Sequence, residues 1–311
     1  MKNHPLLNSL LLALVLIGTP FFFLGGPGYH AARSFQAAWD LGHILYFLLL
    51  SCWLFRFLAP RVAWSPRRLM AAIFIAVFFS GLAVEALQML ASGRSPDPLD
   101  VLRNLEGCLL AFAFCVYPPV LGRHGQRFFR SLVLILLALA VWPLTRALID
   151  ERFAARQFPV LADFETLFEL DRWVNRQQLR PESGRVRHGA KAVRVQLSTA
   201  KYSGISLFHF PGDWRGYRTL RFSVYTPQPS GLVLNSRIHD RHHKVQEFSD
   251  RFNQQFNLQQ GWNDLAIPLD KVRDAPRGRP MDMAQIEGFG LFVIQQASPM
   301  EIWLDYVYLA H

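Results

Sequence analysis

Apolar runs close to the length that a bilayer requires constrain this chain more than any other feature. They cover about residues 5–24, 36–58, 69–91, 105–121 and 128–148. A membrane-spanning helix needs roughly 20 consecutive apolar residues. The 311 residues are 51% hydrophobic, a fraction that suggests a membrane part followed by a soluble part. We therefore predict an α-helical transmembrane bundle of about five helices in residues 1–150.

The loops between these runs predict how the bundle is oriented. Arginines concentrate in the second and fourth loops, at Arg61, Arg67, Arg68, Arg123, Arg127 and Arg130. Positively charged loops stay on the cytoplasmic side of a membrane. The amino terminus is then inside, and everything after the fifth run is outside. An alternative makes the first run a cleaved signal peptide, which would leave the downstream topology unchanged.

Polar residues gather around the third loop and at the start of the second run. They are Asp40, His43, Glu85, Gln88, Arg94, Asp97, Asp100, Asn104 and Gly107. The predicted topology brings them to the outer leaflet, where ionisable groups are costly and usually functional. We predict an outward-facing pocket in which Arg94 binds an anion and Glu85 and Asp100 act as acid and base. The alternative is a structural cluster of interhelical hydrogen bonds, with Asn104 capping the fourth helix or pairing within the cluster.

The order and spacing from Glu85 to Gly107, with His43 near the start of the preceding helix, resemble the VanZ-like family of bacterial membrane proteins over about residues 10–120. Its best-known member is associated with resistance to the glycopeptide teicoplanin. The resemblance implies an envelope protein of the bacterial inner membrane, linked to lipid-borne glycan precursors, and it supplies no mechanism. Family members often carry Asp-Lys ahead of the His, whereas this chain has Trp39 and Asp40, so the partner charge is missing.

A short connection, residues 151–160, is predicted to lead into an all-β domain at 161–311. Short alternating or β-branched segments follow one another there: AVRVQL, GISLFHF, TLRFSVY, LVLNSRI, DLAIPL, FGLFVI and EIWLDYVYL. Turn residues separate them, which is typical of a β-sandwich or jelly roll. The first strand is expected near Phe164. The whole chain is thus predicted to be an α+β multi-domain protein with an extracytoplasmic, periplasmic carboxy-terminal domain.

The segments DFE at 163–165, PGDWRGYRTLRFSVYTP from 211 and IWLDYVYL near the end resemble galactose-binding-like jelly rolls, which include carbohydrate-binding modules. Many such modules hold a structural Ca²⁺, and Glu165 and Asp305 are the expected ligands, with backbone carbonyls. The alternative is that both carboxylates only make surface hydrogen bonds. We expect Trp214, Tyr217 and Trp262 to be core or turn anchors rather than sugar platforms.

Other chemistry is weakly indicated. His239 and His243 could hold Zn²⁺ if they lay on a helix, but they follow a strand and are expected in a loop. Cys52, Cys108 and Cys115 lie in apolar runs and are expected to be small core residues. The net charge of +10 is explained by topology, so no nucleic-acid partner is expected.

Two functions remain open. In the first, the pocket binds or processes a lipid-linked glycan or another anionic envelope headgroup, and the jelly roll recognises glycan. In the second, the chain is a membrane-anchored glycan-binding or scaffold protein without catalysis. The familiar catalytic motifs are missing from the sequence, so whether the protein is an enzyme stays undecided.

Overall fold

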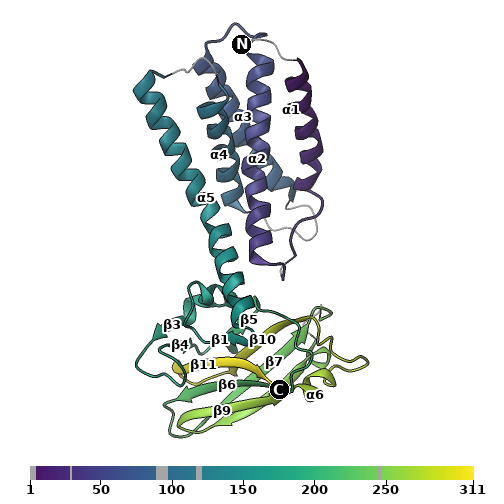
Figure 1. Cartoon of the computed structure of the whole chain (residues 1–311), viewed down its shortest axis with the longest axis vertical. Coiled ribbons are helices and arrows are strands. Elements are labelled where there is room, and N and C mark those ends of the chain that lie inside the picture. Colours follow the sequence, from purple (N-terminus) through teal and green to yellow (C-terminus); the bar gives the residue numbers. More distant parts are fainter. Residues whose placement is uncertain (1–4, 29, 89–96, 117–120, 244–246) are drawn as a thin grey trace. The chain divides into compact units, whose positions relative to one another are not determined.

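The computed structural model describes residues 5–28, 30–88, 97–116, 121–243 and 247–311. The chain forms two compact units, Met1–Thr145 and Arg146–His311. The first is helical and the second is a β-sandwich (Figure 1). This confirms the predicted succession of a helical region and an all-β domain.

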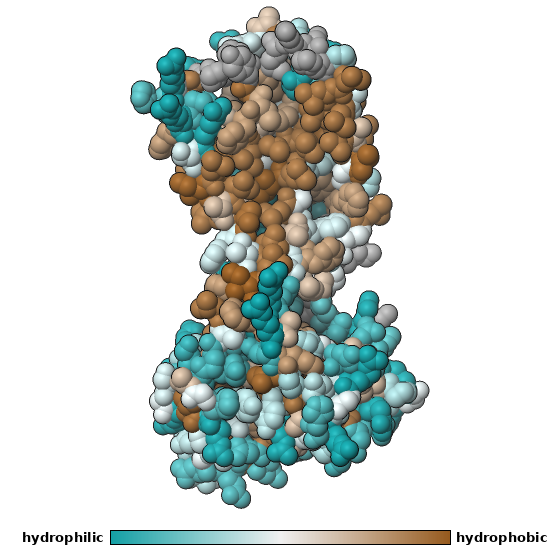
Figure 2. Space-filling view, viewed as in Figure 1, coloured by the Kyte–Doolittle hydropathy of each residue, from teal (hydrophilic) through white to brown (hydrophobic). Residues whose placement is uncertain are grey.

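The helical unit contains α1 (Pro5–Gly18), α2 (Arg33–Leu58), α3 (Pro66–Gln88), α4 (Pro98–Phe114) and most of α5 (Arg123–Gln157), with a 3₁₀ turn η1 (Thr19–Phe22) after α1. Within the described residues, four helical segments are long and apolar enough to cross a membrane: Pro5–Phe22, Arg33–Leu58, Pro66–Gln88 and Arg123–Gln157. Apolar residues cover much of the visible surface of this unit (Figure 2). The helix α4, with 17 residues, carries the polar motif instead.

Helix α4 begins earlier than the sequence indicates. The fourth apolar run was expected to begin near residue 105 with Asn104 as a possible cap, but Asp97 is the N-cap and Pro98 opens the helix. The Asp97 side chain accepts a hydrogen bond from the Leu99 amide at 2.9 Å. A carboxylate cap followed by proline satisfies the first turn, because proline has no amide hydrogen to leave unpaired. Asn104 therefore lies inside the helix.

Helices α2 and α4 approach each other closely at a glycine. A Cβ atom on Gly107 would collide with the backbone of Ile44 and lie 2.9 Å from the Leu48 amide nitrogen. The absence of a side chain at this position is what lets the two backbones meet. Buried apolar side chains then fill the interior of the unit, among them Phe47, Phe55, Leu69, Ile73 and Phe112. This packing holds α2 and α4 together where Ile44 and Leu48 meet Gly107.

Two antiparallel sheets form the sandwich. The six-stranded sheet has the order β3 (Leu179–Glu182), β4 (Ala192–Leu197), β11 (Met300–Ala310), β6 (Thr219–Thr226) and β9 (Gly261–Pro268), with β1 (Val160–Ala162) also on β11. The five-stranded sheet has the order β2 (Trp173–Val174), β5 (Tyr202–Leu207), β10 (Ile286–Ile294), β7 (Leu232–Asp240) and β8 (Phe252–Leu258). Their facing apolar side chains form one core, and the short helix α6 (Leu269–Arg273) follows β9.

The predicted strand segments all lie in strands, at β4, β5, β6, β7, β9, β10 and β11. The first strand, expected near Phe164, is β1 at Val160–Ala162 and ends two residues before it. Phe164 itself has φ 65°, in the left-handed region, and lies after the strand. Strand β8 was not singled out because its FNQQFNL sequence is rich in amides rather than β-branched residues.

Residues 151–160, expected to be a short connection, instead continue α5 up to Gln157 and begin β1 at Val160. The end of α5 belongs to the sandwich unit because a buried ion pair holds it there. The Arg172 Nε atom donates to both Asp150 oxygens at 3.0 Å, and both side chains are fully buried. Arg172 also donates to the Leu161 carbonyl at 3.0 Å. Helix and sandwich therefore share one polar core contact.

Candidate functional site

Arg103 is the centre of the polar cluster in the helical unit. Its guanidinium contacts three carboxylates that come from two helices and the cap of α4. Asp40 on α2 lies 3.0 Å away and the N-cap Asp97 lies 3.2 Å away, while Asp100 is bound more closely still. A guanidinium has five donors in a fixed fork, so it can serve several carboxylates at once. Arg103 thus ties the start of α2 to the start of α4.

Glu85 completes the acidic side of the cluster from α3. Its Oε2 atom accepts a hydrogen bond from the Asp97 amide at 2.8 Å. Its Oε1 atom is buried and has no hydrogen-bond partner among the described residues. One turn further along α3, Gln88 donates to the Phe22 carbonyl at 2.8 Å. Gln88 therefore fastens α3 to the turn after α1 and does not reach the carboxylates.

His43 is buried between two partners on α4. Its Nδ1 atom lies 3.0 Å from Asn104 Oδ1 and its Nε2 atom lies 3.3 Å from Asp100 Oδ2. Both contacts are satisfied by an imidazolium, or by a neutral ring if the Asn104 amide is turned so that its nitrogen donates. In either case the Nε2 atom donates to Asp100. The phenyl ring of Phe22 packs edge-on against the imidazole at 5.0 Å, which fixes its orientation.

The structure thus brings together most of the side chains that the sequence singled out: Asp40, His43, Glu85, Asp97, Asp100 and Asn104. Arg94 lies outside the described residues. The cation that the structure does place here is Arg103, which was not among the residues singled out in the sequence. Its spacing from Asp100, three residues along one helix, was the available signal once α4 is known to begin at Pro98.

The charge balance of this cluster limits its chemistry. Four carboxylates face one guanidinium and one imidazole among the described residues. Asp100 accepts from Arg103 and from His43, so its carboxylate is held by two donors. Of the two predicted acid/base residues, Glu85 is the one with an oxygen that has no hydrogen-bond partner among the described residues. The cluster as described attracts hydrogen-bond donors more than anions.

A second candidate site lies on the outer face of the five-stranded sheet. A hollow of about 600 Å³ is lined from strands β5, β7, β8 and β10. Gly204 lies in its lining, and a Cβ atom there would collide with the backbone of Leu291 and Phe292. Tyr202 and Phe292 stand at one side with their rings edge to face at 6.0 Å. Tyr202 is 63% exposed, and Phe248 in the same hollow is 69% exposed.

Planar polar side chains line the rest of this hollow. Gln255 donates to Asn235 at 3.1 Å across β8 and β7. Arg237 donates to Ser206 at 3.3 Å, and Arg251 donates to Asn253 at 3.0 Å. An amide side chain carries both donors and an acceptor, and a guanidinium carries five donors. Exposed rings beside fixed amide and guanidinium groups provide both stacking surfaces and hydrogen bonds.

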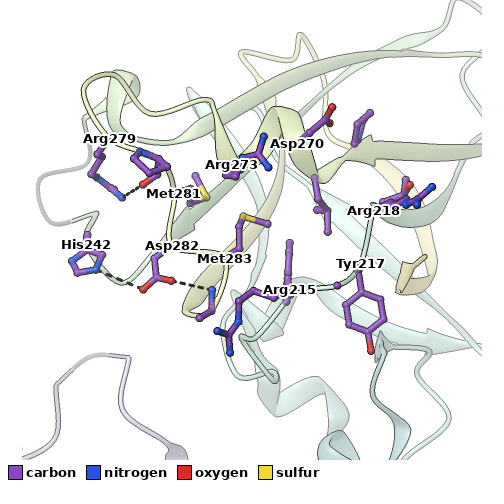
Figure 3. Close-up of a pocket in the computed structure, with 17 residues that line it drawn as sticks. Arg215, Tyr217, Arg218, His242, Asp270, Arg273, Arg279, Met281, Asp282 and Met283 are labelled. Carbon is purple, nitrogen blue, oxygen red and sulfur yellow. Dashed lines mark hydrogen bonds and ion pairs between the residues drawn. The ribbon is translucent and has the colours of Figure 1, made fainter.

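A larger hollow of about 1290 Å³ lies at another part of the sandwich (Figure 3). Its walls include Arg215, Arg218, His242, Arg273 and Arg279, and its lining also contains Met281 and Met283 (Figure 3). Three of the four arginines are already paired with nearby carboxylates, with Arg215 on Asp213, Arg273 on Asp274 and Arg279 on Asp240. These pairs reduce its attraction for an anion.

The three aromatic residues expected in the core or in turns have different surroundings. Trp214 is fully buried in the sandwich core, as predicted. Tyr217 is half-buried and packs between Phe158 and His311. Trp262 is half-buried on β9, where its ring packs against that of Tyr225. The exposed aromatics of the hollow described above, Tyr202 and Phe248, were not singled out because the sequence alone does not show which face of a strand is open.

Glu165 and Asp305, the expected calcium ligands, both bind one loop. Glu165 Oε1 accepts from the amides of Ala190 and Lys191, at 2.6 and 2.8 Å. Asp305 Oδ2 accepts from the amides of Arg187 and His188, at 2.7 and 2.9 Å. Among the described residues, no group of three His, Cys, Asp or Glu side chains is placed to hold a metal ion. The oxygen that remains for a cation is Asp305 Oδ1, which is buried without a hydrogen-bond partner. Calcium binding here stays a prediction.

The expectation of a loop holds for only part of the histidine run. His239 lies in β7 and is buried, and the chain turns at residues 241–242 before His243. His243 lies 3.3 Å from Asp250, and its ring packs against that of His239. Asp240 accepts two hydrogen bonds from Arg279, at 2.6 and 2.9 Å. Burial opposes ionisation of Asp240, but the Arg279 contacts outweigh it and lower the pKa of that carboxyl. The run therefore serves a fixed ion-paired turn.

Comparisons with known proteins give structural neighbours alone. A scan against models of protein families found no match, and a search of curated proteins found no relative. Among solved structures, a family 11 carbohydrate-binding module from Clostridium thermocellum in complex with a β-1,3-1,4-mixed-linked tetrasaccharide shares 14% identity, with a TM-score of 0.37. The match covers 49% of this chain and 94% of the module.

A family 30 module of a cellulosomal cellulase from the same organism shares 14% identity over 47% of this chain and 84% of its own, with a TM-score of 0.33. An exo-β-agarase shares 11% identity over 42% of this chain and 22% of its own, with a TM-score of 0.33. Such values do not indicate what this chain binds. The structural neighbours of its carboxy-terminal unit are β-sandwich carbohydrate-binding modules.

Proposed function

We propose that this chain is a bacterial envelope protein whose helical unit spans the cytoplasmic membrane and whose sandwich binds glycan outside the cell membrane. The outer face of the five-stranded sheet carries the proposal. Tyr202 and Phe248 expose aromatic rings there, and Asn235, Gln255 and Arg237 supply planar hydrogen-bonding groups. Sugars present apolar C–H faces and rings of hydroxyl groups, and this combination of side chains is complementary to both.

The glycan site is tested with the full chain in detergent, by a glycan array followed by calorimetry on the best binder. Tyr202→Ala is expected to weaken binding about tenfold or more, because it removes one stacking surface worth roughly 1–2 kcal/mol. Leu167→Ala is the matched control, since Leu167 is 65% exposed but does not line the hollow. Binding that survives Tyr202→Ala and Asn235→Ala together would exclude this face as the glycan site.

The membrane placement rests on the four apolar helical segments and on the arginine-rich loops. It predicts that the carboxy terminus is outside the cytoplasm. Alkaline phosphatase fused after His311 should be active and a fluorescent protein fused there should be dark, because the phosphatase requires an oxidising compartment. An inactive phosphatase and a bright fluorescent protein would instead indicate that the carboxy terminus is in the cytoplasm.

For the polar cluster we propose a lipid head-group site, as the VanZ-like resemblance implies. Arg103 ties Asp40, on the apolar helix α2, to Asp97, the N-cap of α4. Whether the site also turns over its ligand depends on Glu85, whose free buried oxygen could accept a proton. The alternative is a non-catalytic, anchored glycan-binding protein whose cluster ties helices together through the contacts of Arg103 and His43. Glu85→Gln separates the two, because it should abolish turnover of a retained lipid while leaving glycan binding unchanged.

A further inference from the structure

An apolar groove runs along the helical unit between α1 and α2. It has a volume of about 390 Å³ and is lined from α1, η1 and α2 by Leu14, Ile17, Gly18, Phe21, Phe22, Ala38, Trp39, Gly42, His43, Leu45, Tyr46 and Leu49. Gly42 opens the groove, since a Cβ atom placed there would meet nothing within 4 Å. His43 is the charged or polar exception in the lining. A groove of this composition suits one hydrocarbon chain.

The groove leads to the polar cluster. His43 lines the groove and also contacts Asp100 and Asn104. Asp40 lies three residues before His43 on α2, so both side chains follow one stripe of that helix. With a rise of 1.5 Å per residue, the groove lining from Leu49 to His43 extends over about 9 Å of α2. A molecule lying along it would have its apolar part against Leu45 and Leu49 and its polar part at His43, which contacts the Asp100 carboxylate.

The net charge of the cluster indicates which kind of head group the bound molecule would carry. Arg103 is the guanidinium shared by Asp40, Asp97 and Asp100. Glu85 adds a fourth carboxylate, and its buried Oε1 atom has no hydrogen-bond donor among the described residues. Even with Arg94 counted from the sequence, carboxylates outnumber guanidiniums. An ammonium group supplies three donors and a positive charge, whereas a phosphate alone would be repelled.

We propose that the groove and the cluster together bind a membrane lipid that carries a primary amine on its head group. Its hydrocarbon chain lies between α1 and α2, and its ammonium group lies among Glu85, Asp40 and Asp97. The proposal rests on the proposed placement of the helical unit in a membrane, and it deepens the head-group site by naming the ligand class. It is independent of glycan binding by the sandwich.

The test is native mass spectrometry of the full chain in detergent, titrated with phosphatidylethanolamine or phosphatidylglycerol of identical acyl chains. Wild type is expected to bind the ethanolamine lipid about tenfold more tightly. Gly42→Leu should weaken binding of both lipids by a similar factor, because it fills the groove. Glu85→Gln should reduce the preference for the amine several-fold, because it removes one carboxylate that attracts the ammonium group and repels the anionic phosphatidylglycerol.

Controls and contrary results are separable. Ala71→Leu adds the same bulk at an exposed position of α3 outside the groove and should change nothing. If Gly42→Leu fails to fold, Leu49→Trp fills the other end of the groove. Equal binding of the two lipids, a preference for phosphatidylglycerol, or no binding by wild type would each overturn the proposal. None of these three results would change the outcome of the glycan-binding or reporter-fusion experiments. Failure of the lipid proposal is therefore distinguishable from failure of the proposed function.

Discussion

At the residue scale, Glu165 and Asp305 make similar hydrogen bonds but differ in how deeply they are buried. Glu165 and Asp305 both hold the loop at 187–191 through backbone amides. Gly189 allows this approach, because it has φ 67° and a Cβ atom there would lie 2.5 Å from Glu165 Oε1. Asp305 differs in being fully buried, with one oxygen unsatisfied. Burial raises the pKa of Asp305 above its ordinary 3.8, although the two amide bonds oppose the rise.

This difference predicts a pH-dependent effect of Asp305→Asn. A carboxyl whose pKa is higher in the folded chain contributes stability below its unfolded pKa, and the contribution is lost as the pH rises through the folded pKa. At pH 7 the charged form is therefore a cost, and Asp305→Asn should raise the free energy of unfolding by about 1 kcal/mol. Below about pH 4 the wild-type carboxyl is protonated, so the stability difference between Asp305→Asn and wild type should vanish. Thermal unfolding across that pH range measures it.

The same variant tests the calcium prediction. If Asp305 binds Ca²⁺, wild type should gain thermal stability with added calcium and lose it with a chelator, and Asp305→Asn should remove that response. Wild type that melts at the same temperature with calcium and with chelator would leave the loop-holding role as the sufficient account of both carboxylates. Glu165→Gln serves as the companion variant, since its amide-binding oxygen is retained.

At the scale of elements, the site depends on how closely α2 and α4 pack. The side chains of His43 and Asp40 reach α4 only because Gly107 lets the backbones meet near Ile44 and Leu48. A glycine inside a helix costs about 1 kcal/mol relative to alanine in an isolated helix. The close contact reverses that preference here.

Gly107→Ala is accordingly expected to destabilise the helical unit by roughly 1–3 kcal/mol, through overpacking against α2. Gly42→Ala is the matched control, because both glycines lie within helices and the Gly42 position is open. It should be neutral or slightly stabilising. Thermal unfolding in one detergent compares the two. Equal melting temperatures of Gly107→Ala and Gly42→Ala would mean that α2 and α4 can move apart without destabilising the helical unit.

At the scale of the whole molecule, the boundary between the two units falls inside α5. The last turns of this helix belong to the sandwich unit, because Asp150 pairs with the buried Arg172 and Arg146 pairs with Asp171. An uncompensated buried guanidinium is strongly destabilising. The sandwich therefore requires part of a helix whose remaining length is apolar.

This boundary predicts the behaviour of fragments. Residues 146–311 should fold alone, whereas residues 158–311 should be less stable by about 3–5 kcal/mol, because Arg172 loses Asp150. Urea unfolding of both fragments measures the difference. Arg172→Met in the shorter fragment should restore part of the loss, since it removes the unpaired charge. Two fragments of equal stability would show that water reaches Arg172 once α5 is removed.

The sequence by itself determined the succession of five helices and a β-sandwich, because apolar runs of one length and short alternating segments are local patterns. It also placed seven strands correctly. Tertiary structure alone decided which polar residues meet. Arg103 became the centre of the cluster only when Asp97 capped α4 and Gly107 brought α2 against it. Likewise, burial of Trp214 and exposure of Tyr202 follow from which face of each strand meets the opposite sheet, and that depends on pairing between distant segments.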